Sequence, residues 1–174
     1  MTGVQTCALP ICGKYTKLED SYASIIESFN HCSAHLRCKI NLKWVETTGF
    51  RDASQLDQID GLVVPGGFGS RGSEGKIKAI RVAREQNIPF LGLCLGLQLA
   101  VIEFARHVCD LNGANSTEMD AKTPHPVIDI LPEQRTVTEK GGTMRLGAYP
   151  ALLTKGSVVH SLYGALEEIG RAHV

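Results

Sequence analysis

The sequence has no excess of either charge and no long apolar run. Lys plus Arg and Asp plus Glu each total 18 of 174 residues, so the formal net charge is zero. This balance argues against non-specific nucleic-acid binding, which depends on neutralising phosphates. No apolar stretch approaches the roughly 20 residues that a membrane-spanning helix needs. With 43% hydrophobic residues, the chain suits one globular domain with a core of its own.

The six cysteines do not form a recognisable disulfide or metal pattern. No C-x-x-C pair and no Cys/His spacing typical of zinc occurs, so we expect no metal site. Cys94 and Cys109 lie inside apolar segments. Reduced cysteines in a cytoplasmic protein are the favoured interpretation.

The two ends of the chain carry matching coding sequences. Thr6–Ile11 can be encoded by a DNA segment whose opposite strand encodes Ile169–Val174, as in a translated sequencing adapter. A short signal peptide is the alternative, but the first 12 residues lack a basic start. We therefore predict adapter-derived residues at 1–11 and 168–174 and a partial domain at 12–167, cut at both ends.

Strand and helix patterns alternate along the chain. Strands are predicted at residues 38–44, 62–64, 89–93 and 127–131, and helices at 21–31, 74–86, 95–108 and 157–163. This alternation predicts an α/β fold with a mostly parallel sheet covered on both faces. Ligands bind such sheets at the carboxyl ends of the strands, where both Gly66-Gly67 and Cys94 fall.

Cys94 lies between a predicted buried strand and a predicted helix. Glycines on either side, Gly92 and Gly96, allow the tight turn that projects a nucleophile above a sheet. The helix start favours a thiolate there, and the N–H of Leu95 is free to donate to an oxyanion. Taken alone, this pattern suits an inert buried cysteine equally well.

Further motifs narrow the interpretation. The segments 64–69 (VPGGFG) and 92–98 (GLCLGLQ) resemble the class I, or triad-type, glutamine amidotransferases. The segments 114–118 (ANSTE) and 141–147 (GGTMRLG) resemble the CTP synthase family among them. The resemblance runs from about Gly13 to Gly164 and implies a flavodoxin-like, three-layer α/β/α domain.

The resemblance also implies roles for particular residues. Cys94 is expected to attack the side-chain amide of L-glutamine, with the N–H of Leu95 and a backbone N–H at Gly66 as the oxyanion hole. The glutamine site is expected to comprise Gly67, Leu95, Gly96, Leu97, Gln98 and Glu118. Without the resemblance, Gln98 and Glu118 would be interpreted as ordinary surface residues. The 141–147 loop is assigned no chemical step.

A base for the cysteine is not found in the sequence. The family's His-Pro-Glu run is expected downstream of this chain, together with a basic residue for the glutamine carboxylate. His125-Pro126 is followed by Val127 rather than by the acid of a His-Pro-Glu run. His160 lies in a short predicted helix, so neither histidine is interpreted as the base. We expect the 174-residue chain to be marginally stable and inactive, with Pro10 weakening the first strand.

The resemblance places further ligands and partners in the whole protein. CTP synthases join this domain to a synthetase domain that uses ATP and Mg²⁺ to activate UTP, with GTP as an allosteric activator, and they form homotetramers. No cofactor is expected in the present domain, and no nucleic-acid or membrane partner. A cysteine-elbow hydrolase of the intracellular protease type and a non-catalytic binding module are the alternatives.

Overall fold

The computed structural model describes residues 6–13, 19–67, 69–130 and 148–171, which divide into two compact units, residues 1–129 and 130–174. The strands of the first unit are β1 Thr6–Gly13, β2 Lys39–Glu46, β3 Leu62–Val64, β4 Phe90–Gly92, β5 Asn115–Ser116 and β6 Pro126–Ile128. Its helices are η1 Glu19–Tyr22, α1 Ala23–Leu36, η2 Ala53–Leu56, α2 Ser73–Glu85 and α3 Leu95–His107. The second unit comprises β7 Ala148–Leu152, α4 Val158–Tyr163 and β8 Glu167–Arg171.

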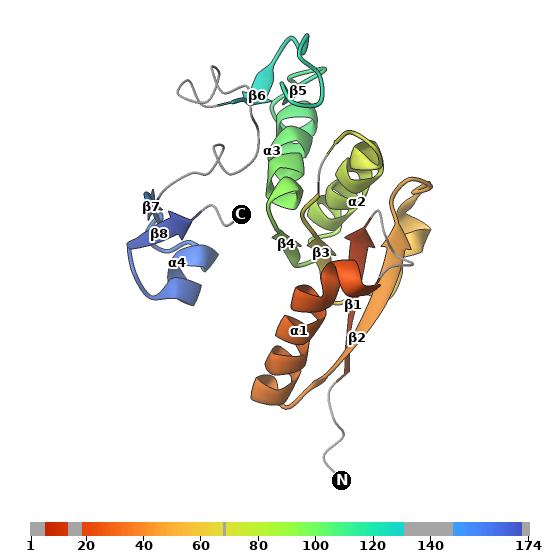
Figure 1. The fold of residues 1–174 in the computed structure, drawn as a ribbon, viewed down its shortest axis with the longest axis vertical. Coiled ribbons are helices and arrows are strands. Elements are labelled where there is room, and N and C mark those ends of the chain that lie inside the picture. The colour runs from red at the N-terminus through yellow and green to blue at the C-terminus, as the bar shows by residue number, and fades with distance from the viewer. Residues whose placement is uncertain (1–5, 14–18, 68, 131–147, 172–174) are drawn as a thin grey trace. The chain divides into compact units, whose positions relative to one another are not determined.

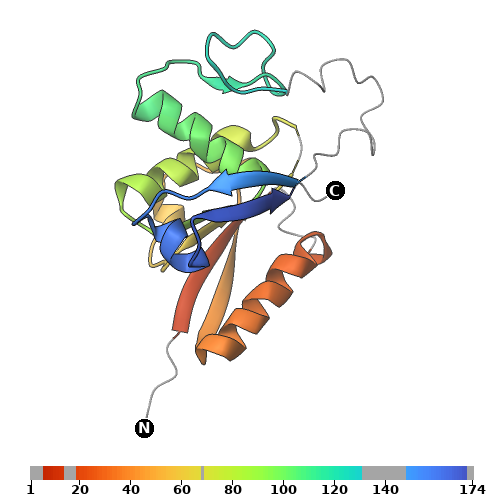
Figure 2. The same cartoon turned by 90° about the vertical axis from the view of Figure 1, so that its left-hand side faces the viewer.

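The first unit is built on a four-stranded sheet in the order β2-β1-β3-β4. All three pairings in it are parallel. The chain moves from β1 to β2 in one direction and from β3 to β4 in the other, so right-handed crossovers place α1 and α2 on opposite faces. Figures 1 and 2 show α1 on one side of the sheet and α2 with α3 on the other. The predicted α/β/α architecture is confirmed.

The core lies between the sheet and the α2–α3 layer. β3 is buried along its whole length, as expected for a strand covered on both faces. The burial of β2 alternates, which confirms the half-buried strand predicted from its sequence. The core is formed by Val45, Phe50, Leu56, Leu62, Val64, Ile77, Ala79, Ile80, Ala83, Leu95, Leu99 and Ile102.

The segment predicted to derive from an adapter forms the central strand β1. It pairs with β2 over its full length but with β3 only at Ile11 and Val63. Ile11 and Pro10 are buried. Pro10 lacks a backbone donor, so it removes one ladder bond from a central strand. An apolar segment of any origin can occupy this place, so the origin of residues 1–11 stays a prediction.

Several elements differ from the prediction. A 3-10 helix, η1, precedes α1, and α1 runs past His31 to Leu36, where Arg37 ends it with φ of 52°. β5, β7 and β8 were not predicted, and β7 pairs antiparallel with β8. The 141–147 loop, part of the family resemblance, lies outside the described residues.

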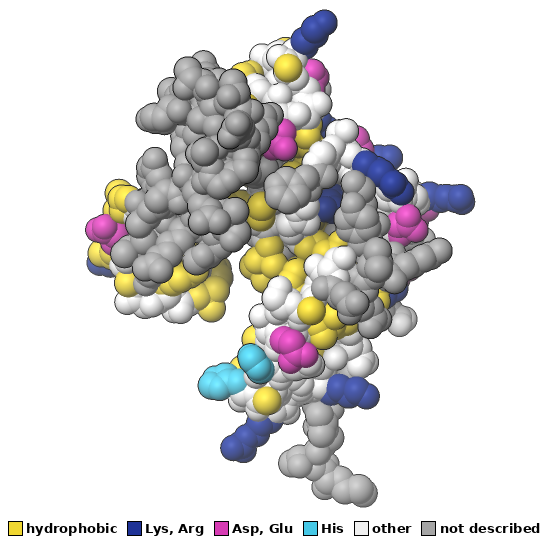
Figure 3. All heavy atoms as spheres, in the orientation of Figure 1, with side chains coloured by type: hydrophobic (Ala, Val, Ile, Leu, Met, Phe, Trp, Pro, Cys, Tyr) yellow, Lys and Arg dark blue, Asp and Glu magenta, His cyan; other side chains and the backbone are white. Residues whose placement is uncertain are grey.

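The surface shows the same balance of charge as the sequence. On the face drawn in Figure 3, basic and acidic side chains are scattered rather than gathered by sign. Among the helices that the structure describes, none has the length and apolarity to cross a membrane.

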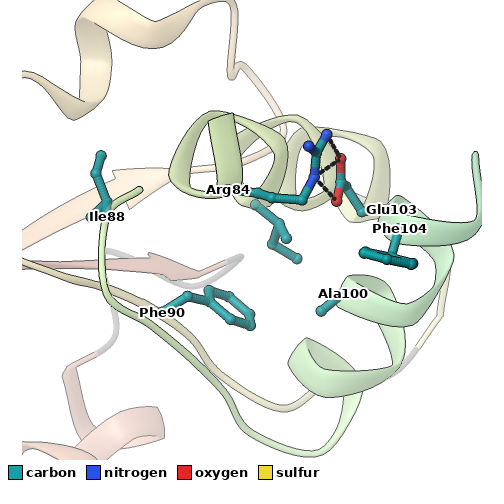
Figure 4. Close-up of a pocket in the computed structure, with 7 residues that line it drawn as sticks. Arg84, Ile88, Phe90, Ala100, Glu103 and Phe104 are labelled. Atoms are coloured by element: carbon teal, nitrogen blue, oxygen red, sulfur yellow. Dashed lines mark hydrogen bonds and ion pairs between the residues drawn. The ribbon is translucent and has the colours of Figure 1, made fainter. Parts of the chain in front are cut away.

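An ion pair joins α2 to α3. Arg84 donates from Nε to Oε2 of Glu103 at 2.9 Å and from an Nη atom to Oε1 at 2.9 Å. These hydrogen bonds raise the pKa of Arg84 above its ordinary value. Figure 4 shows the two side chains facing each other over a hollow of about 260 Å³, with Phe90, Ala100 and Phe104 around it. Glu103 is only 1% exposed, and its carboxylate is held by Arg84 and by Nδ1 of His107, 3.2 Å from Oε1.

We expect Arg84→Met to lower the free energy of unfolding by about 2 to 3 kcal/mol, because it leaves a buried carboxylate with only His107 beside it, a partner that is charged only when protonated. The matched control is Arg81→Met, which breaks an exposed pair with Glu85 (each side chain 48% exposed) and costs at most about 0.5 kcal/mol. Urea unfolding followed by circular dichroism measures both. Adding Glu103→Met to Arg84→Met should restore stability; equal losses for the two arginine variants would contradict the prediction.

Candidate active site

Cys94 stands at a strained turn between β4 and α3. Its backbone has φ of 52° and ψ of −112°, and it occupies the position before the first helical residue. Positive φ is uncommon for a residue with a side chain and is found at nucleophile turns. The side chain is exposed. The structure therefore does not bury Cys94, and the inert-thiol alternative does not fit.

The glycines on either side of Cys94 allow the turn to close. A Cβ on Gly96 would lie 2.0 Å from the carbonyl oxygen of Val64, far inside the van der Waals contact distance. A Cβ on Gly92 would lie 2.7 Å from the backbone nitrogen of Leu97. The turn is held by backbone hydrogen bonds from Gly96 to Leu93 (2.8 Å) and from Leu93 to Val64 (2.9 Å). Any side chain at either glycine would open the elbow.

The turn after β3 faces the cysteine. A Cβ on Gly66 would lie 3.3 Å from Cβ and 3.8 Å from Sγ of Cys94, so the turn lies directly beside the cysteine side chain. Gly67 has φ of 155°, a value that residues with a side chain rarely adopt. Leu95 is the first residue of α3, and its N–H has no acceptor within the helix. Negative charge near Sγ is favoured by the positive end of α3.

A pocket opens beside the thiol. It is lined by Gly67, Gly69, Cys94, Leu95, Gln98, Ser116, Glu118 and Met119. Four residues expected at the glutamine site therefore share it with the nucleophile: Gly67, Leu95, Gln98 and Glu118. Gly96 and Leu97 are not among its walls; Gly96 is packed against Val64, and the Leu97 side chain is 59% exposed.

Glu118 reaches the pocket from the loop between β5 and β6. Its N–H donates to Oγ of Ser116 at 3.2 Å, and Ser116 is itself buried. Thr117 donates to Oδ1 of Asp129 at 2.6 Å, which ties the loop to the end of β6. Gly69, Ser116 and Met119 also line the pocket but were not predicted as site residues. For Ser116 the sequence held a signal, because a serine two residues before Glu118 commonly accepts a backbone hydrogen bond in a turn.

No histidine lines this pocket among the described residues. His125 lies directly before β6, where its carbonyl accepts a hydrogen bond from the N–H of Asn115. His160 lies in α4, in the second unit. Within the described chain, no group of three or more Cys, His, Asp or Glu residues could hold a metal ion.

Comparisons with known proteins agree with this geometry. The family model for class-I glutamine amidotransferases matches residues 17–171. The chain is 56% identical over 165 residues to CTP synthase of Methanococcus maripaludis and 57% identical over 159 residues to that of Methanococcoides burtonii. These matches cover 90% and 89% of this chain, which spans about 30% of the length of such relatives.

A solved structure has the same fold. The glutaminase domain of Trypanosoma brucei CTPS with bound acivicin superimposes with a TM-score of 0.81 at 31% identity, covering 97% of this chain and 66% of that one. The family model matches most of the sequence, residues 17–171. The chain belongs to the class-I glutamine amidotransferase family.

Proposed function

We propose that this chain is part of the glutamine-hydrolysing domain of a CTP synthase. One observation carries the proposal: the elbow thiol of Cys94, the Gly66-Gly67 turn and the carboxylate of Glu118 come together around one pocket. The similarity to CTP synthases supports the particular enzyme. A non-catalytic binding module would not need a nucleophile at a strained turn. A cysteine-elbow peptide hydrolase would have such a turn, but the match of the amidotransferase family model to residues 17–171 favours the glutaminase.

The geometry supports a thioester route. Sγ of Cys94 attacks the side-chain amide carbon of glutamine, and the carbonyl electron pair moves onto oxygen. The N–H of Leu95 and a backbone N–H at Gly66 stabilise that oxyanion. Collapse of the intermediate breaks the C–N bond, and the nitrogen leaves as ammonia after taking a proton. Water then hydrolyses the thioester to glutamate. The general base for these proton transfers lies outside the described pocket.

Two side chains suit the head group of glutamine. The carboxylate of Glu118 can accept charge-assisted hydrogen bonds from the α-ammonium group. The amide of Gln98 supplies a neutral donor and acceptor. Both line the pocket with Cys94. Gly96 and Leu97 would then act through the shape of the elbow, by holding the backbone of Leu95 in place.

The remaining ligands belong to the larger protein. About 70% of the relatives' length lies outside this match, and we place there the synthetase domain, with UTP, ATP and Mg²⁺, and the contacts of a homotetramer. GTP is proposed as an activator of the whole enzyme. The free thiols of the described cysteines fit a cytoplasmic location.

We expect acivicin to modify Cys94 at least about ten-fold faster than Cys109, because the pocket positions the reagent beside one thiol only. Cys109 is a suitable reference because it is also exposed. Peptide mass spectrometry of the treated chain gives both rates. L-glutamine should slow modification of Cys94 and leave Cys109 unchanged. Equal rates at the two cysteines would contradict the proposed function.

The 174-residue chain is expected to release no glutamate from glutamine, because its described pocket contains a nucleophile without a histidine base. An enzyme-coupled glutamate assay measures this, and Cys94→Ala is the control. Hydrolysis that disappears in Cys94→Ala would show that the chain carries a complete catalytic set.

Glu118→Gln should weaken the protection by glutamine about ten-fold or more, because it removes the charge opposite the ammonium group. The rate of Cys94 with iodoacetamide should not change. Asp120→Asn, an exposed acid in the same loop, is the matched control. Equal effects of the two variants would show that Glu118 acts only through the net charge of the loop.

A further inference from the structure

Lys76 is a buried cation that the chemistry above does not use. It lies on α2 and is 3% exposed, whereas Lys78 on the same helix is exposed. Lysine is almost never buried without a partner, and Lys76 has one in this structure. An apolar side chain would fill the same space at lower cost, because an ammonium group must be stripped of water. The groups around the ammonium group must therefore account for a lysine at this buried position.

The ammonium group lies behind the turn that faces Cys94. A Cβ on Gly67 would be 3.8 Å from Nζ of Lys76 and 3.8 Å from Cδ2 of Leu95. Gly67 and Leu95 both line the pocket of the nucleophile. Lys76 itself is not one of the pocket walls. It is therefore placed to act on the oxyanion hole through the backbone rather than by touching a substrate.

The position of Lys76 is fixed by the packing of α2. A Cβ on the preceding residue, Gly75, would lie 1.8 Å from the carbonyl oxygen of Thr47 and 3.2 Å from Cβ of Phe50. The first turn of α2 is thus pressed against the chain that follows β2. Ile77 is 2% exposed, so the next residue is also locked into the core. With α2 held on both sides of Lys76, its side chain has a defined direction.

We propose that Lys76 is a positioning residue of the oxyanion hole. It supports the Gly66-Gly67 turn and adds positive potential where the amide oxygen of glutamine becomes negative. Fixed charge in a site with little water acts strongly on such a developing charge and needs no rearrangement. Glu118 supplies the opposite charge in the same pocket, for the head group. This inference rests on the proposed glutamine hydrolysis.

Two reagents separate this role from a merely structural one. Acivicin reacts by attack of Sγ on the ring C=N carbon, where the electron pair passes to nitrogen before chloride leaves, so a transient anion forms. Iodoacetamide reacts by direct displacement of iodide and forms no anion in the hole. The ratio of the two rates at Cys94 therefore reports on the oxyanion hole, while each rate alone also reports on folding and access.

In the 174-residue chain, Lys76→Met should lower the acivicin-to-iodoacetamide ratio at Cys94 about ten-fold, less than the loss of a direct oxyanion-hole donor because Lys76 acts through the backbone. Methionine keeps the length and helix preference of lysine. Lys76→Arg should restore the ratio to within about three-fold, because the charge returns. Lys78→Met, which removes an exposed charge from the same helix, should leave the ratio unchanged.

An unchanged ratio in Lys76→Met, or a parallel fall of both rates, would overturn the proposal and leave Lys76 with a structural role. If Lys76→Met has no thermal unfolding transition, Lys76→Gln makes the same comparison, because it keeps hydrogen bonding without charge. The proposed function is judged separately on the unmodified chain, by the selectivity of acivicin for Cys94 over Cys109.

Discussion

The site depends on the contact between Gly96 and the carbonyl oxygen of Val64. There the start of α3 touches the end of β3 with no room for a Cβ atom. This contact favours positive φ at Cys94, because β4 must turn into α3 within two residues, Leu93 and Cys94. It also brings the Gly66-Gly67 turn, which directly follows β3 and Pro65, against the thiol. Nucleophile and oxyanion donors are thus set by one backbone contact.

The glycine turns and the regular elements could be predicted because residues close in the sequence determine them. Apolar runs with glycine and proline at their ends indicated β3 and β4, and a nucleophile between two glycines indicated the elbow. Helical periodicity located α2 and α3 within about one residue. Glu118 and Gln98 needed the family resemblance, because a polar residue in a loop or on a helix carries no local sign of its partner.

Lys76 and Glu103 could not be found in this way. Hydrophobic pattern assigns charged residues to the solvent face of a helix, yet Lys76 and Glu103 are 3% and 1% exposed. Their burial is determined by partners distant in sequence, such as Arg84 for Glu103. The antiparallel pair of β7 and β8 was missed for a related reason: β7 contains Pro150, which usually demotes a strand.

The proposed glutamine hydrolysis has two requirements, stabilisation of an oxyanion and transfer of a proton, and the described residues meet them to different extents. Stabilising an oxyanion needs backbone N–H groups at strand and helix ends, which the topology supplies whatever the side chains are. Accepting the proton of the thiol needs a particular side chain at hydrogen-bonding distance, and the described pocket has no histidine. β1 pairs with β3 at a single residue pair, whereas the turn that follows β3 lies directly beside Cys94. The backbone part of the proposed oxyanion hole thus follows from the topology, to which Lys76 is proposed to add charge, whereas proton transfer would need a side chain that the described pocket does not include.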